Sequence, residues 1–205
     1  MKINNEMNRR NLIKLGLYGT GALWANLIVG SSRAAQEHIQ LLPPDRNGVR
    51  LPAGYSSRIV AESSVSPLAG CKYVWHASPD GGACFADQGG GWIYVSNSEL
   101  GDAWGGAGAL RFDADGRLID AYPVLQDTSQ NCSGGATPWG SWLSCEEIDD
   151  GRVWECDPQG VEAAIVRPAL GVFKHEAVAV DSLKRKLYLT EDQVDGCLSL
   201  SRIHI

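Results

Sequence analysis

Carboxylate and thiol side chains gather at the ends of three similar segments of the sequence. The segments Trp92–Glu99, Gly140–Glu147 and Lys186–Gln193 each read aromatic, aliphatic, Ser or Thr, and then polar residues. Carboxylates brought within a few ångströms of one another stay ionised only if cations neutralise them. Hard oxygen donors favour calcium, magnesium or ferric iron, and a thiolate adds a softer donor that suits iron. The pattern therefore predicts a metal site that can support hydrolysis.

The candidate ligands lie at the polar ends of these segments. We expect them to form a ring close to His175 and Glu176, made of Asn97, Glu99, Cys145, Glu146, Glu147, Glu191 and Asp192. A packed thiol at a strand end is the alternative for Cys145, but the two glutamates that follow it favour a ligand. His175 and Glu176 do not form an HExxH zinc motif, because residue 179 is Ala. No catalytic residue is assigned, since the chain has no GxSxG elbow and no P-loop.

The spacing of the three segments indicates an internal repeat. Asn97 and Cys145 are 48 positions apart, and Cys145 and Glu191 are 46 positions apart. Aromatic and β-branched residues with turn residues on both sides predict strands rather than helices. The segments Leu110–Gly116 and Trp154–Gly160 follow at an offset of 44 and each ends in an Asp-x-x-Gly turn.

Repeats of about 40–50 residues with several short strands are typical of β-propeller blades. We therefore expect an all-β fold of propeller blades, with a β-sandwich as the alternative. In a propeller, matching positions of successive blades face one channel, so the polar ends meet in space. The segments before the three strands align more loosely: Trp75–Ala77, Asn131–Ser133 and Lys174–Ala177.

The first 35 residues have the pattern of an export signal that ends in a cleavage site. A twin-arginine pair, Arg9-Arg10, is followed by an apolar stretch from Leu15 to Val29 and by small residues around Ala34. This stretch is shorter than the ~20 residues that a spanning helix needs. We expect a twin-arginine (Tat) signal helix over residues 1–35, recognised by the Tat export machinery, no stable membrane span, and a periplasmic or secreted protein.

Charge and cysteine content limit the possible functions. The formal net charge of −6 argues against a nucleic-acid partner, because phosphate contacts need a basic surface. The six cysteines either form disulfides in an oxidising compartment or stay reduced in a chain that folds before export. No CxxC pair is present, so a zinc knuckle is not expected.

Several longer motifs resemble the PhoX-type family of bacterial secreted alkaline phosphatases. They are Trp75–Gly82, Val95–Glu99, Asn131–Glu147, Arg167–Ala177 and Tyr188–Asp192, within a similarity that runs from Pro43 to Leu198. The resemblance implies hydrolysis of a small phosphate ester on a six-bladed propeller with ferric iron and calcium in its channel. It implies that Cys145 gives the thiolate to iron and that acidic residues complete the cluster: Glu146, Glu176, Glu191 and Asp192. Asn97 and Glu99 hold the equivalent place one blade earlier.

Chain length limits how much of such a propeller is present. Residues 36–205 fill three to four repeats of about 46 residues, so they correspond to the N-terminal part of the PhoX-like domain. A six-bladed propeller needs about 100 residues or more beyond Ile205. The last residues, Ser199–Ile205, depart from the family pattern. Two alternatives stay open: a non-catalytic secreted propeller that binds calcium, and an inactive truncated fragment.

Overall fold

The computed structural model describes residues 40–202 of the chain, and these residues fold as β-structure. In this part there is no α-helix, and the helical turn η1 (Pro168–Leu170) is a 3₁₀ segment. No helix among the described residues is long and apolar enough to span a bilayer. The all-β prediction is confirmed. The predicted signal segment, residues 1–35, lies outside the described residues.

The chain divides between Arg58 and Ile59 into two compact units. Residues 40–58 are the described part of the first unit, and they hold an isolated antiparallel bridge between Leu41 and Pro52. The named strands all belong to the second unit, which begins at Ile59.

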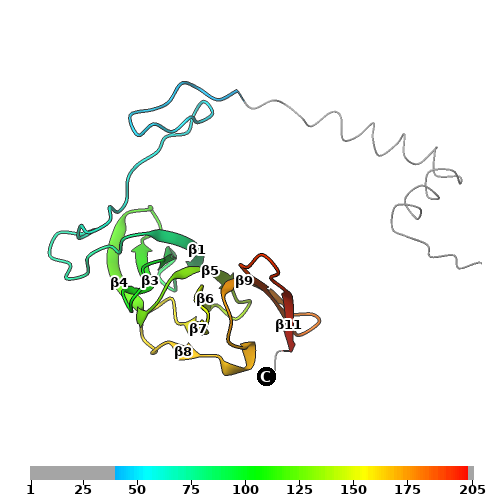
Figure 1. Ribbon diagram of the computed structural model, residues 1–205. Helices are drawn as coiled ribbons and strands as arrows, with labels where there is room; N and C mark the ends of the chain where they lie inside the picture. The colour runs from blue at the N-terminus through cyan, green and yellow to red at the C-terminus, as the bar shows by residue number, and fades with distance from the viewer. Residues whose placement is uncertain (1–39, 203–205) are drawn as a thin grey trace, which may run out of the picture. The chain divides into compact units, whose positions relative to one another are not determined.

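The second unit contains three antiparallel sheets that follow one another along the chain (Figure 1). In each sheet the hydrogen-bonded neighbours are also sequence neighbours. The first sheet consists of β1 (Pro79–Ala86), β2 (Trp92–Ser98), β3 (Gly105–Phe112) and β4 (Leu118–Thr128). The second consists of β5 (Asn131–Ala136), β6 (Trp142–Glu146), β7 (Val153–Cys156) and β8 (Ile165–Val166). The third consists of β9 (His175–Asp181), β10 (Lys186–Glu191) and β11 (Leu198–Arg202).

The three repeated segments of the sequence become the second strand of each sheet, namely β2, β6 and β10. Their pairing with the first strands fixes the alignment: Ser98 pairs with Pro79, Glu146 with Asn131, and Glu191 with His175. The equivalent of Cys145 in the third sheet is therefore Thr190, one residue earlier than the 46-residue spacing indicated.

The predicted Asp-x-x-Gly turns are present after the third strands of the first two sheets. The backbone N–H of Gly116 donates to the carbonyl oxygen of Asp113 at 3.0 Å, and that of Gly160 donates to Asp157 at 3.0 Å. Both glycines have a positive φ, which explains their place at the last position of the turn. The segment after Leu198, which departs from the family pattern in sequence, still continues the sheet as far as Arg202, because Leu198–Arg202 forms β11 beside β10.

The first strands of the three sheets lie side by side, with β5 between β1 and β9. Glycine makes this approach possible on both sides of β5. A Cβ atom on Gly81 of β1 would lie 2.7 Å from the Cα atom of Ser133 in β5. A Cβ atom on Gly135 of β5 would lie 1.9 Å from the carbonyl oxygen of Val178 in β9. No side chain fits at these distances, so glycine sets the spacing of the sheets.

Apolar layers fill the space between neighbouring sheets. Alternate residues of β6 point to opposite sides. Trp142 packs with Ile93 of the first sheet, whereas Leu143 and Cys145 pack with Leu189 of the third sheet. The outer face of the first sheet is covered by the preceding segment, whose Trp75 is 6% exposed and packs with β3 and β4, notably Leu110, Phe112 and Ala121.

The far face of the third sheet stays open in the described part of the chain. Leu198 and Leu200 of β11 are 69% and 55% exposed, and Ala179 of β9 is also exposed. In the repeat, Ala179 is equivalent to Gly135, which contacts the next sheet. The face that packs on a neighbour in the first two sheets is thus solvent-exposed in the third.

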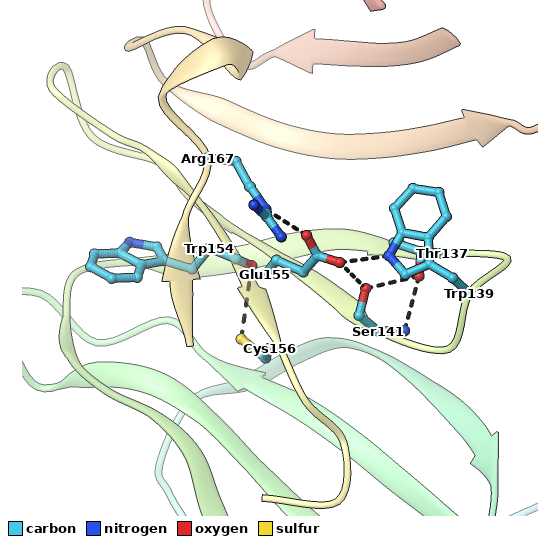
Figure 2. A network of polar contacts seen from close by, with 7 residues as sticks. All are labelled: Thr137, Trp139, Ser141, Trp154, Glu155, Cys156 and Arg167. Carbon is cyan, nitrogen blue, oxygen red and sulfur yellow. Dashed lines mark hydrogen bonds and ion pairs between the residues drawn. The ribbon is translucent and has the colours of Figure 1, made fainter. Parts of the chain in front are cut away.

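Glu155 of β7 ties the β5–β6 turn to the segment that precedes η1 (Figure 2). Its carboxylate accepts hydrogen bonds from Ser141 Oγ at 2.5 Å, Trp139 Nε1 at 2.6 Å and Arg167 Nε at 2.5 Å. Burial acts to raise the pKa of Glu155, but the bonds from Ser141, Trp139 and Arg167 outweigh it and lower the pKa. The carboxylate therefore stabilises the fold in its ionised form.

Substitution of Gly135 by alanine tests the close approach of β5 and β9. We expect Gly135→Ala to lower the free energy of unfolding by about 3 kcal/mol, because the new methyl group overlaps the backbone of Val178. Urea denaturation of the full chain measures the change. Gly101→Ala is the matched control, since a Cβ atom there meets no atom within 4 Å. Equal effects of the two substitutions would contradict the role given to Gly135.

The Glu155 contacts predict a pH dependence of stability. A lowered folded pKa means that the stabilisation is complete above the unfolded pKa of about 4.5 and is lost as the pH falls through the folded value. Glu155→Gln should lower the free energy of unfolding by about 1 kcal/mol at pH 7 and flatten its decline below pH 4.5. Thermal melts of both proteins from pH 7 to 3 measure this, and parallel pH profiles would argue against it.

Candidate metal centre

A repeated irregularity in the first strand of each sheet creates the first half of the candidate site. In β5 the pairing steps three residues, from Asn131 to Gly134, while its partner β6 steps two. The same shift occurs in β1 after Pro79 and in β9 after His175. Each shift is a β-bulge with one extra residue, and such bulges turn a side chain out of the regular alternation. The bulges hold three equivalent residues: Asp80, Cys132 and Glu176.

The second half of the site comes from the residue that follows each second strand. One backbone hydrogen bond of the same kind places all three. Glu99 N–H donates to Ser78 O at 2.9 Å, Glu147 N–H to Gln130 O at 2.9 Å, and Asp192 N–H to Lys174 O at 3.3 Å. The three acceptors are equivalent too, since each directly precedes a first strand. Every sheet therefore contributes two side chains that can act as metal ligands, both at the same end of the sheet.

Three of these six residues come close enough to share one ion. Ligand atoms of Cys132, Glu147 and Glu176 all lie within 4.8 Å of one another. Cys132 is buried, with 2% of its surface exposed, and the two glutamates are partly buried. The thiol lies 3.2 Å from the carbonyl oxygen of His175 and 3.5 Å from that of Glu176. These contacts fix Sγ between β5 and β9.

The acidic groups of the site repel one another electrostatically. Burial, followed by the charge of Glu176 and by a hydrogen bond and charge from Asp192, raises the pKa of Glu147. Burial, followed by the charges of Asp80 and Glu176, raises the pKa of Glu99. The pKa of the Cys132 thiol is also raised, mainly by burial. All these neighbouring charges are negative, so a bound cation would relieve the repulsion.

The donor set fits a metal ion. Two carboxylates supply hard oxygen atoms and Cys132 supplies sulfur, a combination that suits iron or zinc better than magnesium. Asp192 and Glu99 interact with Glu147, and Asp80 interacts with Glu99, so further oxygen donors of the kind that calcium prefers lie near this group. A cation would also favour the thiolate form of Cys132, because ligation replaces the proton.

The comparison with known families agrees with one part of this site. Residues 103–162 match the family model of alkaline phosphatase PhoX. The PhoX match extends from the loop before β3 to the loop after β7 and contains Cys132 and Glu147. It confirms the resemblance read from the motifs over this span of the chain. No curated protein and no solved structure matches the chain.

The structure brings four of the predicted site residues to this end of the sheets: Glu99, Glu147, Glu176 and Asp192. Cys145 lies one strand away, fully buried in the apolar layer with Leu143 and Leu189. Burial, followed by the nearby Cys132 and Glu176, raises the pKa of its thiol. Within the PhoX span, the geometry therefore favours Cys132 over Cys145 as the sulfur ligand.

The remaining predicted ligands already have hydrogen-bond partners. Glu146 accepts from the backbone of Ser129 and Arg152 and from the indole of Trp154. Asn97 accepts from Trp142 Nε1 at 2.9 Å and Ser144 Oγ at 2.9 Å and donates to the carbonyl of Ser133 at 2.8 Å. Glu191 accepts from the backbone of Cys197 at 3.2 Å. These bonds order the strand ends that carry the site.

His175 packs in the interior beside the site. Its ring lies 3.7 Å from that of Phe173, centroid to centroid, and Nε2 is 3.4 Å from Gly171 O. Burial lowers the pKa of His175, which favours the neutral imidazole. The packing therefore supports an interior imidazole at this position.

Sequence reasoning does not assign Asp80 or Cys132 to the site. It aligns Trp75–Ala77 with Asn131–Ser133, whereas the true equivalent is Pro79–Gly81. When the alignment is shifted by four residues, Asp80 becomes the residue of the first sheet that is equivalent to Cys132 and Glu176. The signal is present in the Asp-Gly-Gly and Cys-Ser-Gly-Gly sequences, whose glycines mark the bulges.

Exchange of the two buried cysteines tests which sulfur binds metal. We expect Cys132→Ser to lower metal affinity by about 10-fold or more, because the soft donor is lost. Cys145→Ser should keep the affinity of the parent, since its sulfur lies in the apolar layer. Elemental analysis after loading with iron and dialysis measures occupancy. Loss of metal in Cys145→Ser alone would overturn this assignment.

Proposed function

We propose that the chain is part of a metal-dependent phosphomonoesterase of the PhoX type. The observation that carries this proposal is the group of Cys132, Glu147 and Glu176 within 4.8 Å, two of whose members lie in the PhoX-matching span. The substrate is then a small phosphate ester, and iron and calcium are the proposed metals. The acidic surroundings suit such cations and disfavour a free anion in their absence.

We further propose that the three sheets are consecutive blades of a β-propeller. Three features support this proposal. The strands of each sheet follow the same meander order, the first strands of the three sheets lie side by side, and equivalent residues of the three sheets lie at the same end. In a propeller the innermost strands line a channel, and metals bound there contact several blades at once. Further blades would add donors and phosphate-binding groups to those of the described chain.

The residues of the site have separable roles in this proposal. Cys132, Glu147 and Glu176 hold the first metal ion, and Asp80, Glu99 and Asp192 are suited to hold further ions. A bound metal ion polarises a phosphoryl oxygen and lowers the pKa of a bound water. Glu146 fixes the backbone of Ser129 and thereby the Gln130 carbonyl that positions Glu147.

Export is the proposed route to the compartment where the enzyme acts. The Arg9-Arg10 pair and the apolar stretch after it support recognition by the Tat machinery. Because that machinery carries folded proteins, metal loading can precede export. The six cysteines are free in the structure, as suits a chain that folds in a reducing compartment.

Glu147→Gln separates catalysis from folding. In the metal-loaded full chain we expect turnover of 4-nitrophenyl phosphate, abolished by a chelator and lowered about 100-fold or more by Glu147→Gln. Without metal the same variant should be more stable by about 0.5 kcal/mol at pH 7, a solvent-screened value. The sign follows from the raised pKa of Glu147, which makes its ionised form unfavourable in the fold above pH 4.5.

Two quantities are therefore measured for each protein. They are the rate of 4-nitrophenol release with metal and the urea midpoint without metal. Cys145→Ser is the matched control and should keep its activity. Metal occupancy without turnover would argue for the binding propeller and against the enzyme. Lower stability of metal-free Glu147→Gln would contradict the electrostatic account.

A further inference from the structure

A cavity of about 210 Å³ lies at one end of the first sheet. Its walls include the β3 and β4 ends and the segment before β1, with Tyr73, His76, Ser98, Trp104 and Asp127 among the lining residues. The volume is below the roughly 300–1,000 Å³ of sites for drug-sized ligands, so it suits a small group.

One wall of the cavity is an aromatic pair held by hydrogen bonds. Tyr73 Oη lies 3.1 Å from His76 Nδ1, and His76 Nε2 lies 3.4 Å from Ser96 Oγ. The His76 ring also lies 4.2 Å from that of Trp75. Burial lowers the pKa of His76 to about 4 and raises that of Tyr73, so both rings are neutral at pH 7.

Another wall is the indole of Trp104, whose exposed position is not explained by packing in the core. Trp104 is 78% exposed, although it directly precedes the buried strand β3. Two successive residues with positive φ, Asp102 at 54° and Ala103 at 63°, position it, and Ala103 N–H donates to Ser129 Oγ at 2.9 Å. Backbone strain of this kind is found at binding sites, where it holds a side chain in place.

The charge of the lining selects the ligand. Asp127 is acidic, itself at a positive φ of 58°, and no lysine or arginine lines the cavity. Aromatic rings and a carboxylate that line one cavity favour an organic cation over an anion. A neutral apolar group gains only the aromatic contact. The chemistry of the walls therefore favours an alkylammonium group.

The cavity lies at the same end of the first sheet as the candidate metal centre. Ser98, which lines it, directly precedes Glu99. Backbone bonds continue from this loop to the centre, because Gln130 N–H donates to Leu100 O at 2.7 Å and Glu147 N–H donates to Gln130 O at 2.9 Å. A ligand in the cavity thus contacts the segment that carries one acidic residue of the site.

We propose that this cavity, lined by Trp104, the Tyr73–His76 pair and Asp127, binds a small alkylammonium cation. Resting on the proposed function, the consequence is a preference for phosphate esters of amino alcohols. Their ammonium group would occupy the cavity while their phosphate group faces the metals.

Calorimetric titration of the full chain with choline tests the site without any reaction. We expect saturable binding with a dissociation constant of about 1 mM or tighter, and much weaker binding of 3,3-dimethyl-1-butanol, its neutral analogue. Trp104→Ala and Asp127→Asn should each weaken choline binding by about 3- to 10-fold. Trp139→Ala is the matched control, because Trp139 is a half-exposed indole in a different turn.

The outcomes decide between the two proposals. No choline binding, equal binding of the neutral analogue, or an equal loss in Trp139→Ala would overturn the cation site. The metal-loaded chain should also hydrolyse phosphocholine with a kcat/KM higher than that for 4-nitrophenyl phosphate, and Trp104→Ala should remove this preference. Choline binding without hydrolysis of either ester would contradict the proposed function and leave the cation site standing, and hydrolysis without choline binding would do the reverse.

Discussion

The close approach of β5 to the strands on both of its sides is the contact on which the other features depend. At Gly81 and Gly135 a single methyl group would overlap the backbone of the neighbouring sheet. Because the sheets meet so closely, side chains from β1, β5 and β9 reach one another, and the two apolar layers close behind them. Interiors packed at this density do not stretch to admit a larger residue. The spacing of the candidate metal centre is therefore set by backbone contacts rather than by its side chains.

The ionised carboxylates of the candidate metal centre destabilise the fold, and contacts elsewhere in the unit offset this. Glu99 and Glu147 have raised pKa values because burial and like charges act together. The backbone of this cluster is fixed independently of its carboxylates, by the bulges and by the bonds to Ser78, Gln130 and Lys174. Carboxylates elsewhere show the opposite balance, since Glu155 is paired with donors and keeps a lowered pKa. The contrast separates a charge that stabilises the fold from the charges of the candidate site, which destabilise it.

Much of the fold could be predicted from the sequence, and less of the site. The strands β2, β6 and β10 follow from their aromatic and β-branched residues between turn residues, and the Asp-x-x-Gly turns from their glycines, because both patterns depend on neighbouring residues only. Bulges depend on pairing between strands, and a one-residue insertion moves every later side chain to the other face. The bulge in β5 thus brings Cys132 to the acidic group, whereas Cys145, a plausible strand-end ligand in the sequence, lies on the same side of β6 as Leu143 and packs in the apolar layer. The cavity beside Trp104 has no sequence signature, since it joins residues from four separate segments.

The equivalent bulges also bear on how such a centre can change over evolutionary time. Asp80, Cys132 and Glu176 occupy equivalent β-bulges, yet their side chains differ in length, charge and softness as donors. The bulge fixes the position of the Cα–Cβ bond without restricting the type of side chain. A point mutation at one of these three positions can therefore exchange an oxygen donor for a sulfur donor and leave the scaffold intact. Repetition of the unit thus supplies a set of interchangeable ligand positions, from which preference for one metal over another can be selected step by step.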